Sequence, residues 1–288
     1  MILSMTGFAA ASADLPGASL AAELRSVNHR YLDLSLKLGD ELRPLEPALR
    51  ERLAGELKRG KVELKLVYAR TQAGAGRLAF DPDRVAALAA AAADVARQVP
   101  GATPLSVAEI LRWPGVVIEP AVDGETLAAR ATTLVGEVLR ELAAARAREG
   151  AKLAAVLLAR CDDIEREVAR VAPRLPAVQA AWVEKSNARL REAGLDPASE
   201  RVAQELALFL SKIDVGEELA RLTTHVAEVR RILAAGGAVG KRLDFLAQEL
   251  HREANTLGSK SVDADVSRAS LEMKVAIEQM REQVQNLE

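Results

Sequence analysis

The sequence predicts an α+β protein, with a small N-terminal mixed β-sheet layer that carries a helix, then a large all-helical portion with long helices and a C-terminal helical hairpin. Within the first seventy residues or so, short runs alternate apolar and polar side chains, which is typical of strands with one buried face. Beyond about residue 80, apolar side chains recur at helical spacing instead. Aromatic residues make up only 3% of the 288 residues, so the core must be aliphatic, which favours packed helices.

Three strands and one helix are expected in the N-terminal layer. The alternation is partial in residues 19–27 and regular in residues 31–38 and 61–67, so each range predicts a strand. Asn28-His29 is expected to form the turn or bulge between the first two strands. Residues 44–58 carry leucines and alanines at helical spacing, which predicts a helix packed on the sheet.

Capping residues predict where several helices begin. Asp81-Pro82 combines an N-cap with proline at the first helical position. Ser106 and Glu109 have the spacing of a capping box. Asp196-Pro197 is expected to open another helix, and Asp214 is expected to cap the next one.

Long stretches rich in alanine, leucine and arginine at residues 124–170 and 173–193 predict long helices. Gly236-Gly237 interrupts the pattern before the last two helices, which residues 261–263 are expected to join as an antiparallel hairpin. Neither Gly236-Gly237 nor Gly240 belongs to a phosphate-binding glycine fingerprint, so nucleotide hydrolysis is not expected.

The charge balance limits the kinds of partner. The formal net charge is −2, from 39 basic and 41 acidic residues. A dedicated nucleic-acid-binding domain usually has an excess of positive charge. Any contact with RNA must therefore come from a local basic patch, or from patches that oligomerisation brings together.

The single cysteine and the apolar segments indicate the cellular compartment in which the protein is expected. Cys161 has no partner cysteine for a disulfide or a zinc site, so a small buried side chain is expected. The N-terminus has no basic run before an apolar core, and no apolar stretch approaches the ~20 residues of a membrane span. We expect a cytoplasmic protein without a membrane partner.

Polar residues gather on two helices near the C-terminus. Glu218, Arg221 and His225 are spaced by three and four residues, so they share one helix face. A metal or proton site is one interpretation of this face, and a solvated ladder of ion pairs is the other. In the next helix a similar polar face, which includes Glu249 and Arg252, lies beside the apolar stripe.

Several segments together resemble the YicC (YloC-like) family. The resemblance extends from residue 1 to residue 288, with the motifs in the expected order, and the segments after residue 205 are the richest in them. The matching segments are residues 4–8, 23–33, 42–46, 59–63, 111–116, 214–225, 241–260 and 277–288. On this basis we divide the chain into an N-terminal α+β domain at residues 1–153 and a C-terminal helical domain at residues 154–288.

The resemblance implies an endoribonuclease that depends on a divalent metal cation, here expected to be Mn²⁺ or Mg²⁺, and that cleaves single-stranded RNA. It also implies a ring-shaped homohexamer around a basic channel. Other proteins of RNA degradation are possible partners, and DNA is not expected to be one.

Metal-assisted hydrolysis of a phosphodiester needs hard oxygen ligands, often with a histidine, and cations that hold the phosphate. The predicted metal ligands are Glu218, His225, Glu249 and Glu253. The predicted catalytic residues are His225, Glu249, Glu253 and Arg252, and Arg221 and Lys260 are expected to contact the RNA. With a reference pKa of ~6.5, His225 could alternatively transfer a proton without a metal.

A second polar cluster is expected where two N-terminal strands meet. It contains Arg25, Asn28, His29 and Arg30, and its two interpretations are a contact with the RNA backbone or a hydrogen-bonded corner that fixes the sheet. For the RNA-binding interpretation we select Arg25, Asn28 and Arg30, and the track would continue through Arg43, Arg59 and Lys61.

Two other functions remain open. A non-catalytic RNA-binding adaptor that presents RNA to another nuclease would keep the basic track but would need no metal. A purely structural helical assembly would bind neither RNA nor metal, and the polar face of the helix at residues 241–260 weighs mildly against it.

Overall fold

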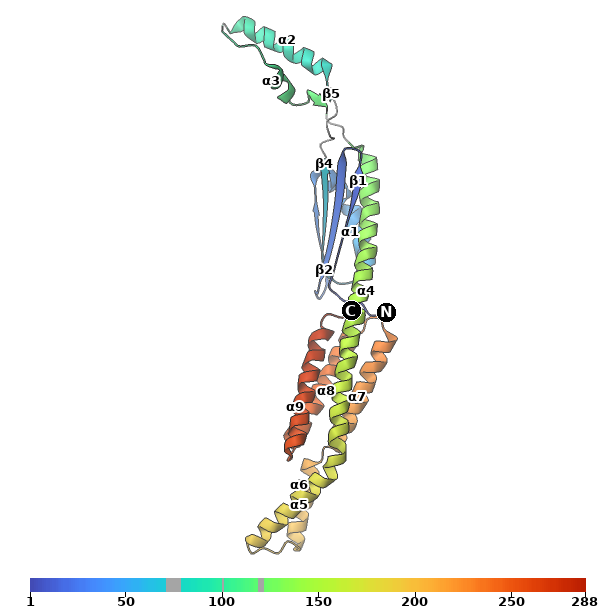
Figure 1. The fold of residues 1–288 in the computed structure, drawn as a ribbon, viewed down its shortest axis with the longest axis vertical. Helices are drawn as coiled ribbons and strands as arrows, with labels where there is room; N and C mark the ends of the chain where they lie inside the picture. Colours follow the sequence, from blue (N-terminus) through green and yellow to red (C-terminus); the bar gives the residue numbers. More distant parts are fainter. Residues whose placement is uncertain (71–78, 100, 119–121) are drawn as a thin grey trace.

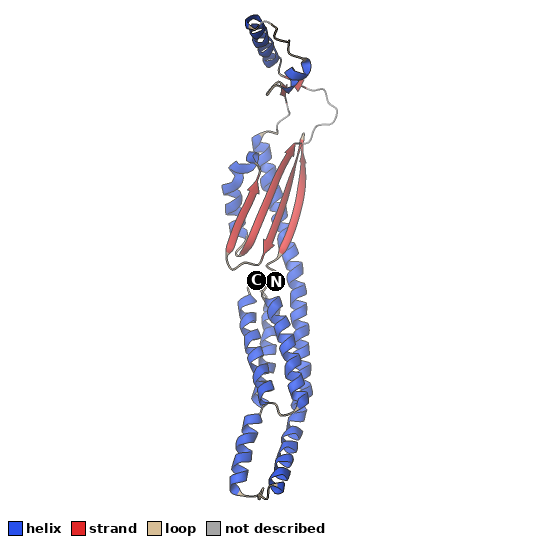
Figure 2. Ribbon diagram, turned by 90° about the vertical axis from the view of Figure 1, so that its left-hand side faces the viewer, coloured by secondary structure: helices blue, strands red, loops and turns tan. Residues whose placement is uncertain are grey.

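The computed structural model describes residues 1–70, 79–99, 101–118 and 122–288. The chain is elongated, with the β-sheet near the middle, a helical bundle beside it, and a short helical extension at each end (Figure 1). The N-terminus and C-terminus lie next to each other where the sheet meets the bundle (Figures 1 and 2).

The sheet is a mixed four-stranded sheet in the order β1-β2-β4-β3. The strands are β1 (Gly7–Leu15), β2 (Ala18–Val27), β3 (Leu32–Leu38) and β4 (Gly60–Arg70). β1 and β4 each pair with β2 in antiparallel orientation, and β3 pairs with β4 in parallel orientation. The three predicted strands and the mixed character of the layer are confirmed, and β1 is an additional strand.

In the described part of the chain, helices cover one face of the sheet. Leu20, Leu24 and Leu64 are fully buried on that face. They belong to one hydrophobic cluster with residues of α1 (Glu46–Glu56) and of the first half of α4 (Gly124–Val171). The helix predicted at residues 44–58 is thus confirmed, with a 3-10 turn at Asp40–Leu45 before it. The other face carries polar and charged side chains in alternation with the buried ones, as expected for a sheet with one solvated face.

The 48-residue helix α4 connects the sheet to the bundle. Leu134 and Leu142 pack in the cluster under the sheet, whereas Leu157 and Ile164 pack in the cluster of the bundle. The boundary predicted between residues 153 and 154 falls inside this helix. That division of the chain stays a prediction.

The bundle consists of the second half of α4 with α7 (Gly216–Ala235), α8 (Gly240–Lys260) and α9 (Ala264–Val284). The expected hairpin is confirmed, because α8 ends at Lys260 and α9 begins at Ala264.

The two extensions hold few buried residues. One contains the short strands β5 (Ala79–Phe80) and β6 (Val117–Ile118) with α2 (Pro82–Gln98) and α3 (Val107–Arg112). The other follows the 3-10 turn Ala172–Arg174 and contains α5 (Leu175–Glu192) and α6 (Glu200–Ile213). Among these helices, as far as the structure describes them, Ile213 is the only buried residue.

The capping predictions have mixed outcomes. Asp81 caps α2, and Ser106 with Glu109 forms the expected capping box. The other two caps were wrong, by three residues for Asp196, since Ser199 is the N-cap, and by one residue for Asp214, since Val215 is the N-cap. Asp196 accepts a hydrogen bond from the Ala198 backbone in the loop before α6, and Asp214 accepts one from Gly216 without being the N-cap. Both aspartates form local turns that compete with the first helical turn.

A buried arginine stabilises the junction between the sheet and the bundle, where the two ends of the chain lie against α4. This junction is called the waist. Arg146 of α4, only 5% exposed, donates from Nε to the Ser4 carbonyl at 2.6 Å and pairs with the Glu288 carboxylate. Gly150, one turn further along α4, allows the N-terminal segment to pass close to this helix, because a Cβ at this position would lie 2.3 Å from the Ile2 carbonyl oxygen. The two ends of the chain are thus held on α4. Among the described residues, no helix is both long and apolar enough to cross a membrane.

Candidate metal centre and nucleic-acid contacts

Three of the four predicted metal ligands come together between α7 and α8. One ligand atom from each of His225, Glu249 and Glu253 lies within 4.8 Å of the other two. The two glutamates are four residues apart and so share one face of α8. The buried residues Val226 and Leu250 hold the two helices together next to this cluster.

Glu253 is a nearly buried carboxylate, with 4% of its surface exposed. Its Oε1 accepts a long hydrogen bond of 3.4 Å from Arg221, which also pairs with Glu217. The hydrogen bond that Arg221 donates to Glu253 and the charge of Glu217 raise the pKa of Arg221 above its ordinary value. A carboxylate in this environment needs further positive charge, because one long and shared contact compensates poorly for its burial.

Glu218, the fourth predicted ligand, does not join the cluster. It is 6% exposed, and its Oε1 accepts a hydrogen bond of 2.8 Å from Lys260 Nζ, which also donates to the Asp214 carbonyl at 3.1 Å. Its Oε2 is buried without a hydrogen-bond partner among the described residues. Glu218 and Lys260 thus tie the start of α7 to the end of α8 through an ion pair whose carboxylate is nearly buried. This pair joins two helices and is therefore not the solvated ladder along one helix face that is the alternative interpretation.

Arg252 lies at the edge of the cluster. Its side chain is 72% exposed and one guanidinium nitrogen is 3.9 Å from Glu249. Of the predicted cations, Arg252 and the half-exposed Arg221 are beside the three ligands, whereas Lys260 is held by Glu218.

The predicted N-terminal RNA contacts do not form one continuous track. Arg25 and Lys61 lie on the open face of the sheet on either side of Glu63, whose pKa is lowered chiefly by a hydrogen bond from Lys37. Arg30 lies over the Tyr31 ring at 5.3 Å.

The remaining residues of this group lie elsewhere. Arg43 pairs with Asp40 at 3.4 Å. Asn28 donates to the Gln285 carbonyl at 2.7 Å, so it contacts the end of α9 and not another part of the sheet. Both interpretations of the N-terminal cluster stay predictions. Asn28 and Arg59 both line a cavity at the waist.

The donor set suits a hard divalent cation. Two carboxylates and an imidazole are typical ligands of Mn²⁺ and suit Mg²⁺ through their oxygens. Ligand atoms on opposite sides of such an ion are about 4 Å apart, so side-chain shifts of less than about 1 Å would close the cluster around it. The poorly compensated carboxylate of Glu253 is the observation in this structure that favours a cation there.

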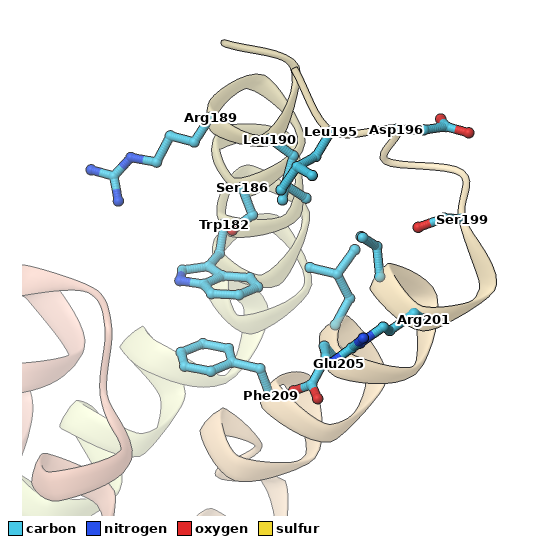
Figure 3. A pocket seen from close by; sticks show the side chains of 12 residues that line it. Trp182, Ser186, Arg189, Leu190, Leu195, Asp196, Ser199, Arg201, Glu205 and Phe209 are labelled. Carbon is cyan, nitrogen blue, oxygen red and sulfur yellow. The ribbon is translucent and has the colours of Figure 1, made fainter. Parts of the chain in front are cut away.

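A larger cavity, of about 740 Å³, lies between α5 and α6 (Figure 3). The rings of Trp182 and Phe209 stack on each other at one side of the cavity, with centroids 3.9 Å apart, and leucines line another side. It contains no metal-ligand cluster among the described residues. Only the rarity of aromatic residues in the chain could have drawn attention to it from the sequence.

The whole chain resembles known proteins. Residues 2–155 match the family described as "Endoribonuclease YicC-like, N-terminal region", and residues 171–288 match "Endoribonuclease YicC-like, C-terminal". A protein of Haemophilus influenzae named "Probable endoribonuclease YicC" is 40% identical over 289 residues, and one of the same name from Clostridioides difficile is 29% identical over 297 residues. Both alignments cover 100% of each chain. This chain therefore belongs to the YicC-like endoribonuclease family.

Proposed function

We propose that this protein is a metal-dependent endoribonuclease that cleaves single-stranded RNA as a ring-shaped homo-oligomer. The observation that carries the proposal is the meeting of His225, Glu249 and Glu253 within 4.8 Å, with two arginines beside them. The names of the relatives support the class of reaction.

The chain's own residues have distinct tasks in this proposal. Glu249, Glu253 and His225 would hold the cation, Mn²⁺ or Mg²⁺, between α7 and α8. When bound, the cation would supply Lewis-acid stabilisation of the phosphate in the transition state. Arg221 donates a hydrogen bond to Glu253 and helps to hold its carboxylate in place, and Arg252 lies where it can contact the scissile phosphate.

His225 could instead act without being a ligand. Its imidazole is half-buried and lies beside two carboxylates, which is an arrangement that orients a ring for proton transfer. In that case His225 would transfer a proton to or from the reacting oxygen while the two glutamates alone hold the cation.

The uncovered apolar side chains of the extensions support an oligomer. Val107 of α3, Leu195 before α6 and Leu208 of α6 are each more than half exposed, at 72%, 55% and 59%. Apolar groups that remain uncovered in a single chain often mark an interface. A homohexamer is the size that the family resemblance implies.

The decisive experiment measures cleavage of an end-labelled single-stranded RNA by highly purified protein, with Mn²⁺ or Mg²⁺ against EDTA. We expect cleavage that requires the metal and that falls at least about 100-fold in Glu249→Gln, because loss of a ligand removes several kcal/mol of transition-state stabilisation. Mn²⁺ binding by calorimetry should weaken in the same variant.

Glu149→Gln is the matched control, because Glu149 is an exposed carboxylate on α4 that makes no ion pair with the described residues. It should cleave and bind Mn²⁺ like the wild type. Cleavage that persists in EDTA, or at the wild-type rate in Glu249→Gln, would contradict the proposal. Tight RNA binding without cleavage would instead identify a non-catalytic adaptor.

A further inference from the structure

A second polar cavity lies at the waist, away from the metal cluster. It has a volume of about 380 Å³, and its described walls come from five separate segments. These are the N-terminal segment at Met5, the turn at Asn28, Arg59 just before β4, the first turns of α8, and the end of α9 with the tail that follows it. Because these segments are far apart in the sequence, only the folded chain brings them together.

The walls carry more positive than negative charge. Arg59, Lys241 and Arg281 line the cavity, and Asp244 is its one carboxylate among the described lining residues. Asp244 already accepts a hydrogen bond of 2.9 Å from Gln248. The excess of cations is local, since the whole chain has a net charge of −2.

The cations of this cavity have few partners in the described part of the chain. Arg59 Nε is buried and has no hydrogen-bond acceptor. Lys241 makes no ion pair, and Arg281 is 3.9 Å from Glu278, the outer limit of an ion pair. A buried N–H without an acceptor is unfavourable, so these groups leave room for an anion that accepts from several donors at once.

The beginning of α8 adds to this preference. Val239, its N-cap, offers no side-chain hydrogen bond to the first backbone N–H groups, and Gly240 lines the cavity. Those N–H groups carry the positive end of the helix dipole and favour phosphate.

The same helix connects the cavity to the metal cluster. Lys241 and Glu249 are separated by eight residues, or about 12 Å along the axis of α8. Lys241, Gln248 and Arg252 follow one another at intervals of seven and four residues and so form one line along the helix. A strand bound at the cavity can therefore follow this line to the cluster.

We propose that the waist cavity binds a backbone phosphate of single-stranded RNA and anchors the strand a few nucleotides away from the bond at the metal cluster. The polymer is inferred from the proposed function, whereas the phosphate is inferred from the cavity itself. Arg59, Lys241 and Arg281 contact the phosphate oxygens, and Asn28 holds the chain tail that forms the opposite wall.

The test measures binding of a short fluorescent single-stranded RNA to the full chain in EDTA, by anisotropy, across a series of salt concentrations. The variant is Lys241→Gln combined with Arg281→Gln. Both side chains are exposed enough to be replaced without disturbing the core. We expect affinity to fall about tenfold or more, and the logarithmic salt slope to shrink by about two, one for each removed cation.

Lys185→Gln is the matched control, since it removes one exposed lysine charge on α5, at the far end of the molecule. It should bind RNA like the wild type. If the double variant binds like the wild type, or if Lys185→Gln loses as much affinity per charge, the proposal is wrong.

Competition separates a backbone phosphate from a terminal or free one. Inorganic phosphate and adenosine monophosphate should displace the RNA only weakly, and RNA with a 5′-hydroxyl should bind as well as RNA with a 5′-phosphate. Strong displacement by the monophosphate, with poor binding of 5′-hydroxyl RNA, would overturn the backbone assignment.

Since binding in EDTA needs no cleavage, the two proposals fail separately. If the wild type cleaves but the double variant binds normally, only the anchoring site is wrong. If the double variant loses binding but the wild type never cleaves, only the nuclease is wrong.

Discussion

Glu253 is the residue on which the candidate centre depends most. Its carboxylate lies between the buried stripe of α8 and the ring of His225, so its charge is largely removed from water. The burial of a charged carboxylate is unfavourable unless nearby positive charge compensates for it, and Arg221 supplies part of that charge. A cation bound by Glu249 and His225 would supply the rest.

Cys161 is a buried residue with no role in the site. Its thiol is 0% exposed in the bundle core, and burial raises its pKa from 9.0 to about 11, partly offset by the charge of Arg230. The expectation of a small buried side chain is confirmed. The thiolate, which is the reactive form, is therefore rare in the folded protein at neutral pH.

We predict that a disulfide reagent at about pH 8 modifies Cys161 slowly in the folded protein and rapidly in urea. The raised pKa also means that the folded state holds the proton more tightly. Stability from this group is thus complete below pH 9.0 and is lost as pH rises from there to about 11. The measurements are the rate of thiol release and the urea midpoint against pH. Fast modification of the native protein, with no unfolding, would contradict this assignment.

At the scale of elements, α8 combines three tasks on different faces. Its apolar residues pack in the bundle, Glu249 and Glu253 face His225, and Lys241 faces the waist cavity. The periodicity of the sequence revealed the first two faces. The third face is defined only in the folded chain, where Asn28, Arg59 and Arg281 surround the start of the helix.

The α5–α6 extension depends on one aromatic contact. The stacked rings of Trp182 and Phe209 have an interplanar angle of 9°. In the described chain, Ile213 is the one buried residue of these two helices. A stacked pair contributes about 0.5–1.5 kcal/mol beyond the burial of its area.

We predict that Phe209→Ala loosens this extension, so that trypsin cuts at Arg191 and Arg201 about five times faster, which is the expected effect of losing roughly 1 kcal/mol of local stability. The measurement is the rate of limited proteolysis with the melting temperature as a check on the bundle. Gln204→Ala is the control, because Gln204 is an exposed residue on the same helix. Equal rates in the two variants would show that the stack does not hold the helices together.

On the scale of the whole molecule, the chain is elongated, with its two hydrophobic cores in the middle and exposed apolar side chains near both ends. Arg146 and the chain ends hold the sheet and the bundle together at the waist. Helix α4 passes through the waist without interruption. A closed ring would cover the ends and place the open sheet faces and metal clusters of several copies around shared space.

We predict that the intact protein sediments as a closed oligomer with a mass of six times 30.8 kDa, rather than as a monomer. Sedimentation velocity and native mass spectrometry measure this directly. A single species of 30.8 kDa at micromolar concentration would contradict the ring, and the metal-centre proposal would be unaffected because one chain supplies all three ligands.

By itself the sequence determined the fold class, the family resemblance and most helices, because alternation and helical spacing report directly on which side chains are buried. It also determined that His225, Glu249 and Glu253 are candidates for one site. It did not reveal β1, whose alanine-rich run Phe8–Ala13 lacks the β-branched residues that mark a strand.

The tertiary structure alone decided which partners each charged side chain finds. Glu218 and Lys260 had the same local pattern as the residues of the cluster, yet they pair with each other, because the packing of α7 on α8 brings the start of α7 beside the end of α8. Likewise, Arg59, Lys241 and Arg281 share no pattern in the sequence. The spacing of residues along one helix determines which of them share a face. Contacts between helices depend instead on how the hydrophobic cores pack, and the pattern of residues within one helix does not contain that information.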